Sequence, residues 1–324
     1  MDKLENSLQR MYRDADPFES KRLERAIIRT VAYADVFDFP LTTEEIFRRL
    51  VGLSASIDSI RSYVRSSNPN PNLLSYLGRY VTLTGREHLV ETRLAGERIA
   101  AELWPQAIRY GNLIANLPYV RMVAVTGALA VNNANHRADI DYLIVTSPDR
   151  LWLCRAFVVL LVRWAALQET ILCPNYFLSL RALDITPHSL YTAQEIAQMV
   201  PLSGPQTYRA MRRINNWTDD FLPNSRLNGS RFRKQPEKET QRQLYGQVIG
   251  ERVFGNGFGS WCDRWEMDRK IRKFSRIYKS NEEVDYSPDW CKGHYSGHGK
   301  KTLQAYSERL MSLNIPDDES LWIR

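Results

Sequence analysis

The chain has 324 residues, 44% of them hydrophobic, and carries 44 basic against 37 acidic side chains, which gives a formal net charge of +7. A single hydrophobic core seldom serves a chain of this length, so we expect two or three compact units. The modest positive charge favours anionic partners such as nucleotides, nucleic acid or anionic lipid head groups, and it does not choose among them.

The first residues alternate in charge and lack the apolar core of a secretory signal, so we expect a cytoplasmic protein. The most apolar stretch, Leu151 to Leu167, is interrupted by Arg155 and Arg163. A membrane span needs about 20 apolar residues with few charges, so this stretch predicts a buried amphipathic helix and no transmembrane segment.

The cysteines are widely scattered, so the sequence shows neither a disulfide framework nor a CxxC pair, and core thiols are expected at Cys154, Cys173, Cys262 and Cys291. Cys291, His294 and His298 form half of a zinc-like pattern. No second pair of ligands stands at a suitable distance, so we interpret this run as a loop and a helix start.

Residues 1–84 contain three helical patterns followed by a small hairpin. Helices are predicted at 23–34, within 38–52 behind a Thr42 or Thr43 cap, and at 56–64, and two strands flank the turn at 77–79. This order resembles a winged-helix domain, whose third helix would read DNA. Arg61 and Arg65 are the only basic residues on that third helix, and Arg79 lies at the tip of the hairpin, so phosphate contacts would be few. The unit is therefore either a DNA-binding surface or a contact for another protein or for the next domain.

Residues 85–221 alternate between helical and strand patterns, which favours an α+β unit with a mixed sheet flanked by helices. The expected elements are a helix at 85–116, strands at 120–125 and 140–146, a short helix between them, a helix at 151–167 and a strand at 171–180.

The last third, 222–324, begins with a polar, proline-containing stretch at 222–241 that predicts a linker, and it continues as a helical region. Trp261, Trp265 and Phe274 alternate there with basic residues. Such a pattern can bind nucleic acid or a membrane surface, but we favour packing of these aromatic rings on the protein itself.

The residues that carry chemistry lie between Val123 and Thr146. A buried strand ends at Thr126, and Gly127-Ala128 opens a short helix, where backbone N–H groups can approach a phosphate closely. Asp139-Ile140-Asp141 then leads into the next strand. Residues two apart on a strand face the same side, so both carboxylates would project together. Two hard oxygen ligands side by side suit Mg²⁺.

Gly127-Ala128, the ten residues that follow and Asp139-Ile140-Asp141 resemble the G-[GS]-x(7–13)-D-x-D signature of the nucleotidyltransferase superfamily, of which DNA polymerase beta is a member. The resemblance covers mainly residues 123–146. It implies that Thr126, Gly127 and Ala128 contact the phosphates of an NTP. Arg137, in the loop just before the aspartates, either meets the triphosphate or belongs to a solvated loop. It further implies that Asp139 and Asp141 hold Mg²⁺ or Mn²⁺.

Two positions depart from the family pattern. Ala128 stands where the family commonly has Ser, so a hydroxyl contact to phosphate is missing. The family's third carboxylate lies on a following strand, and the strand at 171–179 contains no acid. Asn175 is our candidate for that third catalytic position, although a neutral amide cannot act as a base. Asp184 or Glu195 could supply the missing carboxylate.

The sequence therefore predicts a Mg²⁺-dependent (or Mn²⁺-dependent) nucleotidyltransferase that transfers a nucleoside monophosphate from an NTP to a hydroxyl acceptor. Its catalytic residues would be Asp139, Asp141 and Asn175. The alternative is a protein with the same fold and weak catalysis, which acts as a regulator by binding nucleotide, or by binding DNA through the N-terminal domain.

Overall fold

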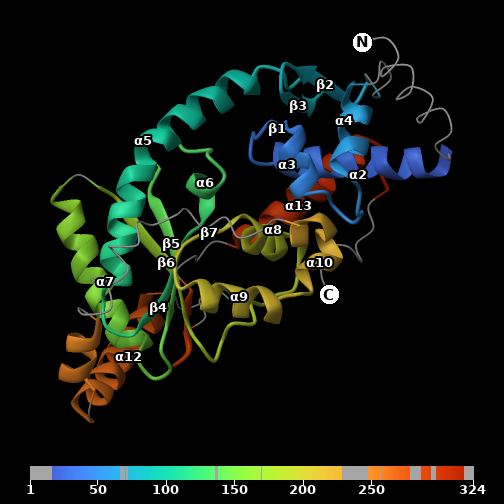
Figure 1. The fold of residues 1–324 in the computed structure, drawn as a ribbon. Helices are drawn as coiled ribbons and strands as arrows, with labels where there is room; N and C mark the ends of the chain where they lie inside the picture. Colours follow the sequence, from blue (N-terminus) through green and yellow to red (C-terminus); the bar gives the residue numbers. More distant parts are fainter. Residues whose placement is uncertain are drawn as a thin grey trace.

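The computed structural model describes residues 17–65, 70, 72–135, 138–168, 170–227, 247–255, 257–277, 286–292 and 297–316. It has an α+β architecture with two separate sheets (Figure 1). A small antiparallel sheet belongs to the N-terminal unit. A larger mixed sheet, flanked by helices, carries most of the rest of the chain.

The N-terminal unit combines three helices with a three-stranded sheet in the order β1-β3-β2. Its elements are α2 (Pro17–Asp35), β1 (Leu41–Thr42), α3 (Thr43–Arg48), α4 (Ile57–Arg65), β2 (Leu74–Leu77) and β3 (Tyr80–Leu83). The start of α3 is fixed by a capping box, in which the Thr42 hydroxyl accepts from the Glu45 N–H and the Glu45 carboxylate accepts from the Thr42 N–H. These elements agree with the three helices and the hairpin predicted from the sequence.

The larger sheet has the strand order β7-β4-β5-β6-β8, and all neighbours are antiparallel except the parallel pair β5 and β6. Its strands are β4 (Val120–Val125), β5 (Ile140–Thr146), β6 (Leu172–Ser179), β7 (Val200–Ser203) and β8 (Trp290–Lys292). The bounds of β4 and β5 are those predicted from the apolar runs.

Alternation along β4 and β5 buries both faces of this sheet. Val123 and Ile144 point into one apolar cluster, whereas Met122 and Val145 point into another. The first cluster is covered by α5 (Leu89–Ala115), α7 (Leu151–Ala166) and α12 (Gly257–Ile277), and the second by α8 (Leu190–Gln198) and α9 (Pro205–Ile214). Helices on both faces make the sheet a rigid support for side chains at its ends.

Two interpretations of the last third of the chain are wrong. The linker does not begin at residue 222, because α10 (Thr218–Phe221) leads into the 3-10 helix η1 (Pro223–Leu227) and Asn224 within it is fully buried. The Asn224 amide donates to the carbonyls of Phe47 and Ala55 and so holds the N-terminal unit. The rest of the predicted linker, 228–241, lies outside the described residues. The C-terminal region is also not purely helical, because β8 adds a strand to the larger sheet.

The C-terminal helix α13 (His298–Ser312) packs between the two parts of the molecule. Tyr306 is fully buried in an apolar cluster with Tyr33 of α2, Leu190 of α8 and Phe221 of α10. The Gly52 N–H also donates to the Phe221 carbonyl at 2.8 Å. The N-terminal unit thus packs against α8, α10 and α13.

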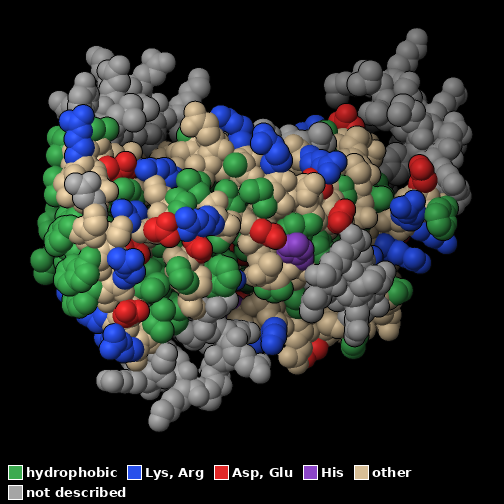
Figure 2. All heavy atoms as spheres, turned by 90° about the horizontal axis from the view of Figure 1, so that it is seen from below, with side chains coloured by type: hydrophobic (Ala, Val, Ile, Leu, Met, Phe, Trp, Pro, Cys, Tyr) green, Lys and Arg blue, Asp and Glu red, His purple; other side chains and the backbone are tan. Residues whose placement is uncertain are grey.

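Aromatic side chains form an exposed row on α12, contrary to our expectation that they pack on the protein itself. Phe258, Trp261 and Trp265 are each more than half exposed, and their rings stack in sequence. Figure 2 shows hydrophobic and basic side chains together at the end of the molecule where α12 lies. The side chain of Phe274 lies outside the described residues. Among the helices that the structure describes, none combines the length and apolar character needed to cross a bilayer.

Candidate functional site

The ends of β4 and β5 bring Gly127 against Asp141. Val125 pairs with Tyr142, and the Thr126 N–H donates to the Asp141 carbonyl at 3.1 Å. Gly127 then turns the chain into α6 (Gly127–Ala130) with φ of +63°, a conformation that favours glycine. A Cβ at this position would lie 2.2 Å from Asp141 Oδ2. Glycine is therefore needed here for two reasons, the backbone conformation and the close carboxylate.

Asp139, Asp141 and Cys173 form the cluster of metal-ligating side chains found among the described residues. One ligand atom from each lies within 4.8 Å of the other two. Asp139 immediately precedes β5, Asp141 is its second residue, and the parallel pairing of β5 with β6 sets Cys173 opposite Asp141. The two carboxylates that the sequence singled out thus lie together at the start of the central strand, β5.

Asn175 also reaches this cluster, but it presents its amide nitrogen. Its Nδ2 donates to Asp141 Oδ1 at 2.7 Å. An irregularity in the β5–β6 register between the Asp141 and Leu143 pairs allows both Cys173 and Asn175 to approach Asp141. Asn175 therefore orients a carboxylate here, and the side chain that joins both aspartates in the cluster is Cys173.

The sequence reasoning missed Cys173 because it looked for an acid on β6 and treated the four cysteines as core thiols. A signal was available, since Cys173 lies two residues before Asn175 and residues so spaced share one face of a strand. All four cysteines are free thiols. Cys291 is buried in β8, and its proposed neighbour His294 lies outside the described residues.

Burial and mutual repulsion dominate the electrostatics of the cluster. Burial, and then the neighbouring Asp139, raise the pKa of Asp141 to about 7, while a hydrogen bond from the Cys173 thiol opposes the shift. The same burial, with the two carboxylates, raises the pKa of Cys173 to about 12. The thiol is therefore neutral at physiological pH, whereas a cation between the carboxylates would favour their ionised forms.

Glu195 of α8 is a further carboxylate on this side of the sheet. Burial, and then the charge of Asp141, raise the pKa of Glu195 to about 7, and Arg49 of the N-terminal unit lowers it. The pKa of Tyr191, one turn earlier on α8, is also raised, by burial and then by the charges of Glu195 and Asp141. Of the two acids considered as substitutes from the sequence, Glu195 is thus coupled to the cluster, whereas Asp184 pairs with His188 at 3.1 Å.

The donor set fits a hard divalent cation at the two aspartates and departs from it at the third position. Mg²⁺ and Mn²⁺ take carboxylate oxygens, and two of them converge here beside the Gly127 turn. Cys173 offers sulfur in place of a third oxygen. Of the other phosphate contacts suggested by the sequence, Thr126 and Ala128 flank Gly127, whereas Arg137 lies outside the described residues.

Comparison of the chain with family models, with curated proteins and with solved structures finds no match. The case for a function therefore rests on the residues and their geometry.

Proposed function

We propose that the protein is a nucleotidyltransferase of the polymerase beta type, with an N-terminal winged-helix-like domain. The observation that carries the proposal is the contact between the Gly127 turn and the Asp141 carboxylate, with Asp139 beside it. A phosphate-approaching turn and a pair of metal-binding carboxylates lie at the ends of neighbouring strands, which is the arrangement that the motif in the sequence implies.

In this proposal the substrate is an NTP whose phosphates meet the backbone N–H groups of Gly127 and Ala128. The acceptor hydroxyl oxygen forms a bond to the α-phosphorus as the bond from that phosphorus to the pyrophosphate oxygen breaks. Mg²⁺ or Mn²⁺ at Asp139 and Asp141 would stabilise the charge on the attacking and leaving oxygens. Asn175 holds Asp141 in place through its amide.

We propose that Glu195 acts as the general base and accepts the proton of the attacking hydroxyl. A general base works best with a pKa near the working pH, and the pKa of Glu195 is raised to about 7 by burial and by Asp141. Neither side chain on β6 can take this role at neutral pH, because the Asn175 amide is not a base and the Cys173 thiol holds its proton.

The test is incubation of purified protein with each α-labelled NTP and Mg²⁺ or Mn²⁺, following label transfer and pyrophosphate release. Equal samples of the Asp139→Asn/Asp141→Asn double variant run alongside. The proposal predicts pyrophosphate release by the wild-type protein that disappears in the variant. Release that persists in the variant would exclude these carboxylates from the reaction.

A second candidate is a nucleotide-binding regulator with the same fold and weak catalysis. Cys173, a neutral thiol, stands beside the aspartates where a third carboxylate is expected, and Ala128 lacks the hydroxyl of Ser. Nucleotide binding without pyrophosphate release, even when candidate acceptor hydroxyls are supplied, would favour this candidate over the enzyme.

Recognition of DNA by the N-terminal domain has weaker support. Arg61 of α4 pairs with Glu44 and Asp58, and Arg79 of the hairpin turn pairs with Glu97, so two of the three basic residues singled out for DNA contact have acidic partners. A duplex affinity that falls steeply with salt would favour this role.

A further inference from the structure

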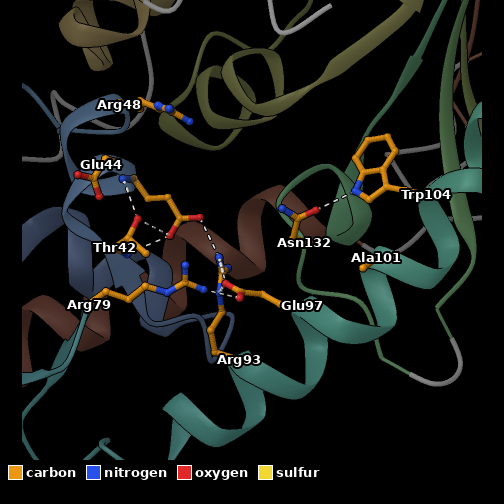
Figure 3. Close-up of a pocket in the computed structure, with 10 residues that line it drawn as sticks. Thr42, Glu44, Arg48, Arg79, Arg93, Glu97, Ala101, Trp104 and Asn132 are labelled. Carbon is orange, nitrogen blue, oxygen red and sulfur yellow. Dashed lines mark hydrogen bonds and ion pairs between the residues drawn. The ribbon is translucent and has the colours of Figure 1, made fainter. Parts of the chain in front are cut away.

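A cleft opens between the N-terminal unit and the larger sheet. It consists of two adjoining hollows of about 430 and 260 Å³ that share Glu45, Arg48, Trp104 and Asn132. Pockets for small ligands commonly measure about 300 to 1,000 Å³. The cleft is walled by α3 on one side, by α5 on another and by the end of α6 on the third (Figure 3). It is therefore large enough for a small ligand and is formed jointly by the two parts of the molecule.

The acidic side chains of the cleft already have cationic partners. The Arg93 guanidinium, almost fully buried, pairs with both Glu45 and Glu97 at 2.9 Å, and it also donates to the Val131 carbonyl at the end of α6. Glu44 pairs with Arg61 at 3.1 Å. These contacts hold α3, α5 and α6 in a fixed relation and leave little free negative charge on the walls.

Arg48 and Arg49 give the smaller hollow an excess of positive charge. Arg48 is the last residue of α3 and Arg49 is its C-cap, and both line this hollow together with Ala130 and Val131 of the α6 end. Figure 3 draws Arg48 without a hydrogen bond or ion pair to the other residues shown. The hollow thus presents two half-buried guanidinium groups opposite the short helix that Gly127 begins.

The same hollow reaches the end of β4 that leads to Gly127. Val200 lines it and pairs with Val125, two residues before Gly127. Arg49 and Asp141 both act electrostatically on Glu195, and in opposite directions, because Arg49 lowers its pKa and Asp141 raises it. A residue of the N-terminal unit and a residue of the aspartate cluster therefore act on the same carboxylate, that of Glu195.

We propose that this cleft holds the polyphosphate of a nucleoside triphosphate, with Arg48 and Arg49 as its cationic ligands. The inference rests on the proposed function and deepens it, because it makes the N-terminal unit one wall of the nucleotide site. Guanidinium groups bind phosphate through charge-assisted hydrogen bonds. Asp139 and Asp141 would hold the metal, and Arg48 and Arg49 would neutralise charge on the phosphates.

Binding of two probes by the full-length protein tests the inference. Isothermal titration calorimetry in the presence of Mg²⁺ measures the Kd of α,β-methylene-ATP, which cannot transfer its nucleotide, and of inorganic tripolyphosphate. The variants are Arg48→Ala, Arg48→Lys and Arg49→Ala. Arg65→Ala is the matched control, because it removes one exposed arginine from the same unit outside the cleft. Urea unfolding of each variant checks that the fold is retained.

Loss of a charge-assisted contact should weaken binding of both probes by about tenfold or more in Arg48→Ala and Arg49→Ala. Arg48→Lys should recover part of the loss, and Arg65→Ala should match the wild-type protein. Unchanged affinity in Arg48→Ala would overturn the inference while leaving the nucleotidyltransferase proposal intact. A loss confined to α,β-methylene-ATP would also overturn it, since the arginines would then contact the base or sugar. Failure of the wild-type protein to bind either probe would overturn both.

Discussion

Gly127→Ala should destabilise the protein more than replacement by alanine of any positive-φ glycine of the N-terminal unit, which are Gly52, Gly78 and Gly85. The added Cβ would lie 2.2 Å from Asp141 Oδ2 and 3.0 Å from its Cγ, so the carboxylate would have to move. That movement breaks the 2.7 Å hydrogen bond from Asn175. Left-handed backbone strain of about 1 to 2 kcal/mol and loss of a charged hydrogen bond of about 1.5 to 3 kcal/mol give an expected cost of about 3 to 5 kcal/mol.

The matched control is Gly78→Ala in the hairpin turn. Gly78 has φ of +61°, close to the +63° of Gly127, but a Cβ there would have no heavy atom within 4 Å. Its cost should therefore be the backbone strain alone, about 1 to 2 kcal/mol. Urea unfolding measures both. In an Asp141→Ala background, where the clashing oxygen is gone, the cost of Gly127→Ala should fall to that of Gly78→Ala. Equal costs for the two glycines in the wild-type background would refute the close approach of Gly127 and Asp141.

Three further predictions concern the site and its support. Cys173→Asp adds a third carboxylate to the cluster, so the metal-free variant should melt at a lower temperature than the wild type. Mg²⁺ should raise the melting temperature of this variant by more than it raises that of the wild type or of Cys173→Ser. An equal effect of Mg²⁺ on all three proteins would contradict the cluster. Because burial and Asp139 raise the pKa of Asp141 from about 3.9 in the unfolded chain to about 7, the native state holds a proton that the unfolded chain has lost between those values. The unfolding free energy of the metal-free wild type, relative to Asp141→Asn, should therefore fall as pH rises from about 4 to about 7 and then level off, and urea titrations that show parallel curves would argue against this environment. Arg93→Ala leaves Glu45 and Glu97 partly buried without their cation and should lower the free energy of unfolding in urea by about 3 to 5 kcal/mol. As the control, Arg98→Ala removes an exposed arginine from the same helix and should stay within about 0.5 kcal/mol of the wild type. Similar values for the two variants would show that the Arg93 network does not stabilise the fold.

The parts of the fold that follow a local rule could be predicted from the sequence. The apolar run at Val120–Val125 and the Gly127 turn gave β4 and the start of α6, and the run after Asp139 gave β5. Each depends on neighbours within a few residues. The Thr42 cap of α3 is equally local, because the capping box closes within four residues.

The rest depends on contacts between distant residues. β8 is only three residues long and pairs with β6 more than 100 residues earlier, so no local pattern marks it. Cys173 and Glu195 gain their chemical interest from Asp141, which lies on another strand. The exposure of Trp261 and Trp265 could not be read from α12 alone either, because spacing places side chains on one face without saying which face meets the core.

Manganese binding tests the central claim most directly, since it asks whether Asp139 and Asp141 hold a divalent cation at a nucleotide site. Electron paramagnetic resonance of free Mn²⁺, titrated with protein in the presence and absence of α,β-methylene-ATP, measures the bound fraction. We predict one class of site in the wild-type protein whose affinity rises with the nucleotide, and loss of that site in Asp139→Asn and Asp141→Asn variants that still fold. Undiminished Mn²⁺ binding in both variants, or wild-type binding indifferent to the nucleotide, would contradict the account.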